Sequence, residues 1–151
     1  MKRFTFRYQT LLEVRERAQQ QEQELLQHLL RRQQESQGEL AGLFNDEQAQ
    51  RDAWLAAQQS GGLDLDDIAM IQQFLYVLDT RIRAQRQAVE DSVARVDNQR
   101  ELLTEAMRQA EIIRKLKERD EKAWRAEVES AEAKELDELA TLRHAYNQTR
   151  H

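Results

Sequence analysis

The stretch SGGLDLDD, Ser60–Asp67, is the one part of this sequence that has the residues of a chain reversal. Gly61-Gly62 can end a helix, because glycine reaches left-handed backbone angles without steric cost. Asp64 then suits the N-cap of a following helix, and Leu63 and Ile68 fall at the two positions of a hydrophobic staple. The stretch therefore predicts a turn between two helices.

Composition on both sides of this turn favours long helices. Charged residues make up 34% of the 151 residues and aromatic residues 6%, with no proline and no cysteine. A chain dominated by Ala, Leu, Gln, Glu and Arg is typical of coiled coils, and so few turn formers argue against a sheet. We predict an all-α fold, an antiparallel two-helix coiled-coil hairpin with the second helix longer than the first. The helices are expected over about 11–58 and 65–147, with the turn over about 59–64, in a single elongated domain of residues 1–151.

Each predicted helix carries a stripe of apolar or small residues at steps of three and four, which places them on one face. A capping box at Thr10–Glu13 is expected to open the first helix. The first stripe has polar interruptions at Glu22, Gln33, Glu47 and Arg51, and it runs through Leu11, Val14, Ala18, Leu25, Leu29, Ser36, Leu40, Leu43 and Trp54. The second stripe is more regular and runs through Ile68, Ile71, Leu75, Leu78, Ile82, Gln85, Val89, Val93, Val96, Arg100, Leu103, Met107, Ala110 and Ile113.

The position of the turn predicts that the second helix outruns the first. If the chain folds back at the glycine pair, residue i lies near residue 123 − i, so Leu11 comes level with about Ile112. Residues after about 114 then project beyond the first helix, although an apolar stripe resumes there. That stripe consists of Trp124, Val128, Ala131, Leu139, Leu142 and Tyr146.

Charge is unevenly distributed in the projecting segment. Basic residues outnumber acidic residues six to three from Arg114 to Arg125, and acidic residues outnumber basic residues six to one from Ala126 to Glu138. Such runs are often solvated helix faces with opposite charges at i, i+4, here for example Glu121 and Arg125. A surface for a partner explains in addition why the runs lie beyond the hairpin's own first helix.

Several functional classes find no support in the residues. His28, His144 and His151 are too scattered for a metal site, and no Gly-rich phosphate loop is present. A two-helix rod offers no concavity for catalysis, so we expect no enzyme, no cofactor and no small-molecule substrate. A net charge of −5 argues against nucleic-acid binding. Because no apolar run reaches about 20 residues and MKRFTFRYQT lacks a secretion signal, we expect a cytoplasmic protein.

Three smaller features each have a structural and a functional interpretation. Aromatic Phe4, Phe6 and Tyr8 in a basic N-terminal arm either fold onto the second helix near Ile112, Leu116 or Trp124, or dock on a partner. Phe74 and Leu78 are either hairpin core or part of a docking stripe. The sequence Gly38-x-x-x-Gly42 is interpreted as a weak stretch of helix rather than a close-packing motif.

Three segments of the chain together carry a family likeness: FTFRYQTLLEVRER (Phe4–Arg17), QQFLYVLDTRI (Gln72–Ile82) and KLKERDEKAWRAEVESAEAKELDELATLR (Lys115–Arg143). They resemble zones of the flagellar export protein family FliJ. Their order and spacing about the glycine turn fit the whole length of the chain.

The resemblance implies a non-enzymatic, stalk-like coiled coil of the flagellar type III export apparatus. The implied partners are the hexameric export ATPase, whose ring receives the end bearing both termini, the export gate membrane protein and export chaperones, with any membrane association made only through partners. The positions that match gate-linked family residues are Leu43, Phe74 and Leu78, followed by Arg81 and Gln85, which differ in type. For the ATPase ring our hypothesis names Phe4, Phe6, Tyr8, Lys115, Lys117, Arg119 and Trp124.

Two alternatives stay open at this point. Injectisome relatives share the same architecture, and a generic structural coiled coil could pair its projecting segment with that of a second copy.

Overall fold

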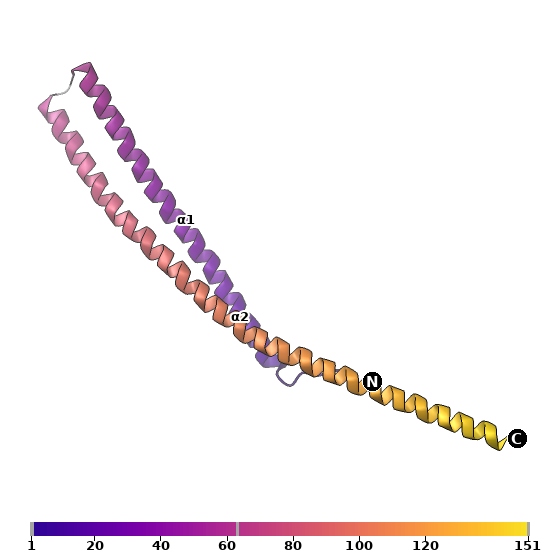
Figure 1. The fold of residues 1–151 in the computed structure, drawn as a ribbon. Coiled ribbons are helices and arrows are strands. Elements are labelled where there is room, and N and C mark those ends of the chain that lie inside the picture. Colours follow the sequence, from indigo (N-terminus) through magenta and orange to yellow (C-terminus); the bar gives the residue numbers. More distant parts are fainter. Residues whose placement is uncertain (1, 63, 151) are drawn as a thin grey trace. The chain divides into compact units, whose positions relative to one another are not determined.

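The chain forms two long α-helices. The computed structural model describes residues 2–62 and 64–150 and contains α1 (Gln9–Ser60) and α2 (Leu65–Thr149), which are 52 and 85 residues long. No β-strand occurs in these described ranges. The helices form an antiparallel hairpin with a longer second helix, as predicted (Figure 1).

Contacts divide the chain into two compact units. The terminal unit contains residues up to Gln19 and residues from Glu105 onward, and the turn unit is Gln20–Thr104. The terminal unit thus joins the beginning of α1 to the second half of α2, and the turn unit contains the chain reversal.

α1 ends at Ser60, two residues later than the expected residue 58, and a left-handed glycine follows it. Gly61 has a φ of +68°, a conformation that side-chain-bearing residues rarely adopt. The Gly61 N–H donates to the Gln58 carbonyl at 3.3 Å, and the Ser60 hydroxyl donates to the Ala57 carbonyl at 2.9 Å. These bonds satisfy carbonyl groups in the last turn of the helix.

Asp64 caps α2 as predicted. Its Oδ1 accepts a hydrogen bond from the Asp67 N–H at 2.9 Å, and its carbonyl accepts the Ile68 N–H at 3.2 Å, so helical bonding begins here. The expected staple includes Leu63, which lies outside the described residues.

The predicted capping box at Thr10–Glu13 is wrong, because α1 begins earlier, at Gln9. The Tyr8 carbonyl accepts the Leu12 N–H at 2.9 Å, which makes Tyr8 the N-terminal flanking residue. Thr10 therefore lies inside the helix, where its hydroxyl is not needed as a cap.

The least exposed positions of both helices follow strictly alternating steps of three and four. This is a heptad repeat, with one face of each helix directed at the other. In α1 these seam positions are Leu12, Arg15, Gln19, Glu22, Leu26, Leu29, Gln33, Ser36, Leu40, Leu43, Glu47, Gln50, Trp54 and Ala57. In α2 they are Ile68, Ile71, Leu75, Leu78, Ile82, Gln85, Val89, Ser92, Val96, Gln99, Leu103, Ala106, Ala110, Ile113, Lys117, Asp120 and Trp124.

The sequence-based stripes were wrong by one residue at several turns. Leu11, Val14 and Leu25 are 37%, 52% and 45% exposed, and the seam instead uses Leu12, Arg15 and Leu26. Similarly, the seam includes Gln50 rather than Arg51, Gln99 rather than Arg100, and Ala106 rather than Met107, while Ser92 is more buried than Val93. At three of these turns the seam residue is polar or small and its neighbour is more apolar, so hydrophobicity alone favours the wrong position: Arg15 beside Val14, Ser92 beside Val93 and Ala106 beside Met107.

Two glutamines of α2 bond to backbone carbonyl groups of α1 across the turn unit. Gln85 Nε2 donates to the Ser36 carbonyl at 2.9 Å, and Gln99 Nε2 donates to the Glu22 carbonyl at 3.0 Å and also to the Glu22 carboxylate. A carbonyl oxygen can accept this second bond beside its helical one. The 123 − i rule places Ser36 opposite Gln87, so the observed register differs from it by two residues.

We expect Gly38→Ala and Gly42→Ala each to raise the free energy of unfolding by about 0.5–1 kcal/mol, because alanine restricts the unfolded chain and favours the helix. Both glycines lie within α1 with no atom within 4 Å of an added Cβ, which fits a weak stretch of helix and leaves room for the methyl group. Urea denaturation followed by circular dichroism measures the change.

Gly61→Ala is the matched comparison. It adds the same methyl group at a φ of +68°, so it should lower the stability by about 1 kcal/mol. Equal effects at Gly42 and Gly61 would contradict the assignment of their backbone roles.

Candidate functional site

The N-terminal arm, residues 2–8, lies against α2 in the terminal unit (Figure 1). The Phe4 and Trp124 rings are 5.9 Å apart between centroids, at an interplanar angle of 49°. Phe6 is 6% exposed and contacts Tyr8 edge to face at 5.9 Å. The structural interpretation of the arm, folding onto the second helix near Trp124, is therefore the one observed, and Phe4 and Phe6 are engaged within the chain.

Arg114 links the start of α1 to α2. Its guanidinium contacts the Glu16 carboxylate at 3.3 Å, the Glu111 carboxylate at 3.1 Å and the Gln19 side-chain oxygen at 3.1 Å. The bonds to Glu111 and then Glu16 raise the pKa of Arg114 above its ordinary value. The Arg114 guanidinium therefore stabilises the contact between α1 and α2. Its ion-pair partners are Glu16 and Glu111 rather than Glu118, the acidic residue at i, i+4.

The three basic residues named for a ring contact do not share one face. Lys115 and Arg119 are exposed and lie four residues apart, on the side of α2 away from the seam, and Arg119 is 3.7 Å from Asp120. Lys117 occupies a half-buried seam position. A partner approaching from solvent can therefore contact Lys115 and Arg119 together.

From Glu129 to Arg150 every residue is exposed. The arm lies against α2 at Trp124, and Trp124 and Val128 are half-buried, so the fully exposed part of α2 begins after residue 128. A groove lies beside the N-terminal end of the arm. Its lining residues are Lys2, Trp124, Glu127, Val128, Ala131, Glu132 and Glu135.

The five residues linked to the export gate by resemblance have different environments in the turn unit. Leu78 is 2% exposed and belongs to the seam, Leu43 is half-buried, and Gln85 is bonded to Ser36. Phe74 is 45% exposed and Arg81 is also exposed. Phe74 and Arg81 are thus the members able to touch a partner directly, while Leu78 and Gln85 hold the hairpin beneath them.

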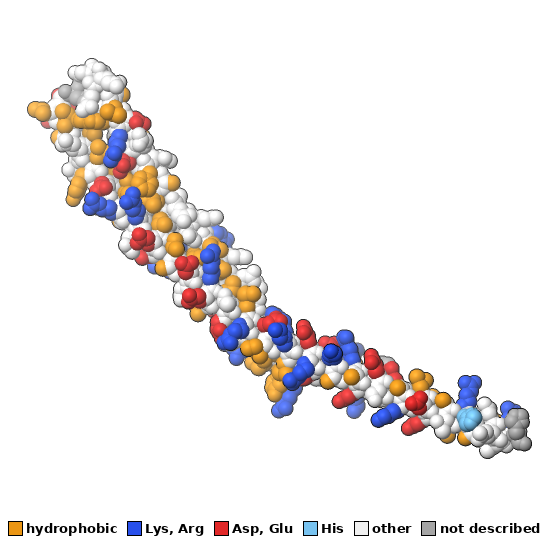
Figure 2. All heavy atoms as spheres, in the orientation of Figure 1, with side chains coloured by type: hydrophobic (Ala, Val, Ile, Leu, Met, Phe, Trp, Pro, Cys, Tyr) orange, Lys and Arg blue, Asp and Glu red, His pale blue; other side chains and the backbone are white. Residues whose placement is uncertain are grey.

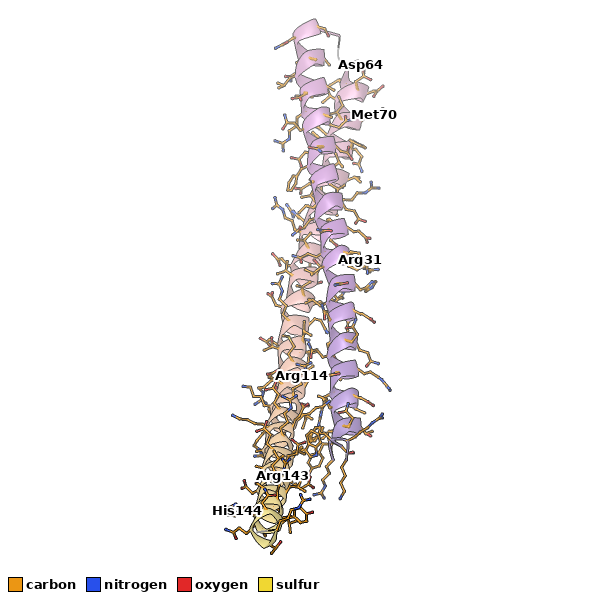
Figure 3. The ribbon with its side chains drawn as sticks, turned by 90° about the vertical axis from the view of Figure 1, so that its right-hand side faces the viewer. Arg31, Asp64, Met70, Arg114, Arg143 and His144 are labelled. Atoms are coloured by element: carbon orange, nitrogen blue, oxygen red, sulfur yellow. The ribbon has the colours of Figure 1, made fainter. Side chains whose placement is uncertain are left out.

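Phe74 and Arg81 line an apolar groove that the sequence analysis missed. Its other residues come from both helices and include Met70, which lies near the beginning of α2 (Figure 3). Hydrophobic side chains gather near this end of α2 in Figure 2, and Met70 is 72% exposed. A signal was present in the sequence, because Met70, Phe74, Val77 and Arg81 follow steps of four, three and four, one residue before the seam positions.

Within residues 2–62 and 64–150, no group of three or more His, Cys, Asp or Glu side chains is placed to hold a metal ion. His28 and His144 lie far apart in the chain, and His151 is outside the described residues. None of the described helices is long and apolar enough to cross a membrane.

Comparison with known proteins identifies one family. A family model described as flagellar FliJ protein matches residues 4–149. No curated protein and no solved structure matches this chain.

We expect Phe4→Ala to shift the fluorescence emission of Trp124 to longer wavelength, because removal of the Phe4 ring exposes the indole to water. The measurement uses a Trp54→Phe background, so that Trp124 is the single emitter. Thr5→Ala, at an exposed neighbouring position of the arm, should leave the emission unchanged. An emission maximum unaffected by Phe4→Ala would show that the arm does not cover Trp124 in solution.

Proposed function

Because this chain belongs to the flagellar FliJ family, we propose that it acts as a non-enzymatic central stalk of the type III export apparatus. Family membership makes it a coiled-coil protein associated with flagellar export. The proposal adds that it binds the ring of the export ATPase and the export gate, and that it assists the delivery of chaperones and substrates. It works in the cytoplasm and reaches the membrane only through these partners.

The terminal unit supplies the surface proposed for the ATPase ring. Lys115 and Arg119 present two cations side by side, away from the seam, and the arm carries two further cations, Lys2 and Arg3, in the same unit. Exposed charges guide association and form contacts that exchange easily, which suits a stalk that must release as well as bind. Phe4, Phe6 and Trp124 act here by holding the arm in place.

The turn unit supplies the surface proposed for the export gate. Exposed apolar side chains grouped in a groove are typical of protein docking sites, and Phe74 and Met70 form such a group with Arg81 at its edge. The family resemblance and the groove both select Phe74, Leu78 and Arg81, and among these Phe74 is the apolar side chain that is exposed.

We expect the double variant Lys115→Glu/Arg119→Glu to bind the cognate export ATPase about threefold to tenfold more weakly, since each exposed ion pair contributes about 0.2–1 kcal/mol. The measurement is ATPase stimulation in a purified mixture, titrated over protein concentration and at two salt concentrations. Arg51→Glu/Arg83→Glu is the matched control, because it reverses two exposed arginines of the turn unit that each form an i, i+4 ion pair. Stimulation that is equal for both double variants at every concentration would exclude this ring surface.

We expect Phe74→Ala to weaken binding to the purified export gate protein about tenfold or more, because an aromatic anchor in an apolar groove typically carries a large share of binding energy. Tyr76→Ala is the control, since Tyr76 is 69% exposed and does not line the groove. Leu78→Ala should instead lower the free energy of unfolding by about 2–4 kcal/mol, because Leu78 is buried. Gate binding unchanged by Phe74→Ala in a folded protein would contradict the assignment.

A further inference from the structure

Beyond the arm, α2 continues with an exposed apolar stripe. The C-terminal stripe consists of Val128, Ala131, Leu139, Leu142 and Tyr146, of which the last three are 63%, 67% and 61% exposed. At 100° per residue these side chains lie within about 60° of the Val128 direction, whereas Leu136 lies about 80° away on the margin. The stripe is therefore one face of a helix with large apolar side chains in water.

This stripe continues the face that α2 uses in its coiled coil. Trp124 is the last seam position, and Val128 follows it by one helical turn. Up to that point the same face is covered, first by α1 and then by the arm, and the groove at the end of the arm opens onto Val128 and Ala131. The pattern that pairs α2 with one antiparallel helix thus extends past the residues that its own chain supplies.

Carboxylates surround the first half of the stripe. Glu132 and Glu129 lie on one side, Glu127 and Glu138 on the other, and Glu135 lies within it, by the same helical geometry. Lys134 is the single basic residue between Glu127 and Glu138. Along these turns red carboxylates and orange apolar side chains lie close together in Figure 2.

We infer that the C-terminal stripe docks a helix of another protein, an amphipathic helix whose apolar face is flanked by lysines and arginines. The apolar side chains extend the existing seam, and the basic flanks neutralise the acidic side chains beside it. Charge complementarity of this kind selects one partner class and disfavours acidic helices.

A second copy of this chain satisfies these requirements less well. Two stripes in parallel bring their acidic halves together. In an antiparallel pair, the acidic half of one stripe faces residues 139–150 of the other, which offer Arg143 and Arg150 against the six carboxylates of residues 127–138, so the acidic charge is only partly neutralised. Arg143 and its neighbour His144 lie in the final turns of α2 (Figure 3).

The inference goes beyond the proposed stalk function, because it uses different residues and a different kind of contact. The ring surface depends on the charges of Lys115 and Arg119, whereas this site depends on the apolar contact that residues 128–146 would form with a partner helix. Either site can fail in experiment while the other holds.

The test uses the full-length chain and a synthetic probe. The probe is a labelled peptide of three heptads with leucine at positions a and d and lysine at e and g, compared with one carrying glutamate at e and g. Fluorescence anisotropy at physiological salt should show at least tenfold tighter binding of the lysine peptide. Leu139→Glu and Leu142→Glu should each weaken that binding tenfold or more, since each places a charge in the apolar contact.

Leu136→Glu is the matched control, because it adds the same charge to the same helix on the margin of the stripe. It should change the affinity by less than about threefold, with equal helicity by circular dichroism for all variants. Equal losses at Leu136 and Leu139 would mean that the probe responds to charge alone, and equal binding of both peptides would exclude a basic partner. Sedimentation showing a dimer that Leu142→Glu dissociates would make a second copy the occupant. Each of these three results overturns the inference.

Discussion

The structure depends on a strictly alternating three-and-four spacing that both helices share. In α1 it runs from Leu12 to Ala57, and in α2 it runs from Ile68 to Trp124. This spacing keeps one face of each helix directed at the other over the whole length of α1. The face is unusually polar for a coiled coil, because Gln85 and Gln99 occupy seam positions and bond to backbone carbonyl groups. Such bonds require particular partners, so they specify the register of the helices while adding less stability than leucine would.

The arm changes what the second half of α2 presents to solvent. Phe4 is non-helical, yet its ring lies against Trp124, on the same face of α2 that α1 covers before it. Within the terminal unit, α2 presents three kinds of surface. The first is a seam that is closed by α1 and the arm, the second is a basic face at Lys115 and Arg119, and the third is an exposed apolar stripe among carboxylates. One helix can therefore present chemically distinct surfaces. Its different sides, and different stretches along its length, carry different kinds of side chain.

The candidate sites could be predicted in part. Phe74 was named from family resemblance, and its exposure makes it available to a partner. Leu78 and Gln85 were named on the same grounds, but the structure uses them within the hairpin, since i, i+4 spacing on a helix does not say which of two adjacent stripes faces the partner helix. The groove that contains Met70 was missed, although its spacing repeats the seam one residue earlier. From the sequence alone, two adjacent apolar stripes on one helix cannot be distinguished from one broad apolar face.

The sequence by itself determined the all-α class, the turn at the glycine pair, the Asp64 cap and the greater length of the second helix. These features follow from local chemistry: backbone freedom at Gly61, a carboxylate able to accept an N–H, and the place of the turn along the chain. Only the tertiary structure decided which neighbour enters the seam, such as Leu12 rather than Leu11, and that the arm covers Trp124. Those choices depend on burial against a partner segment. Burial is a property of two surfaces in contact, and neither helix contains that information alone.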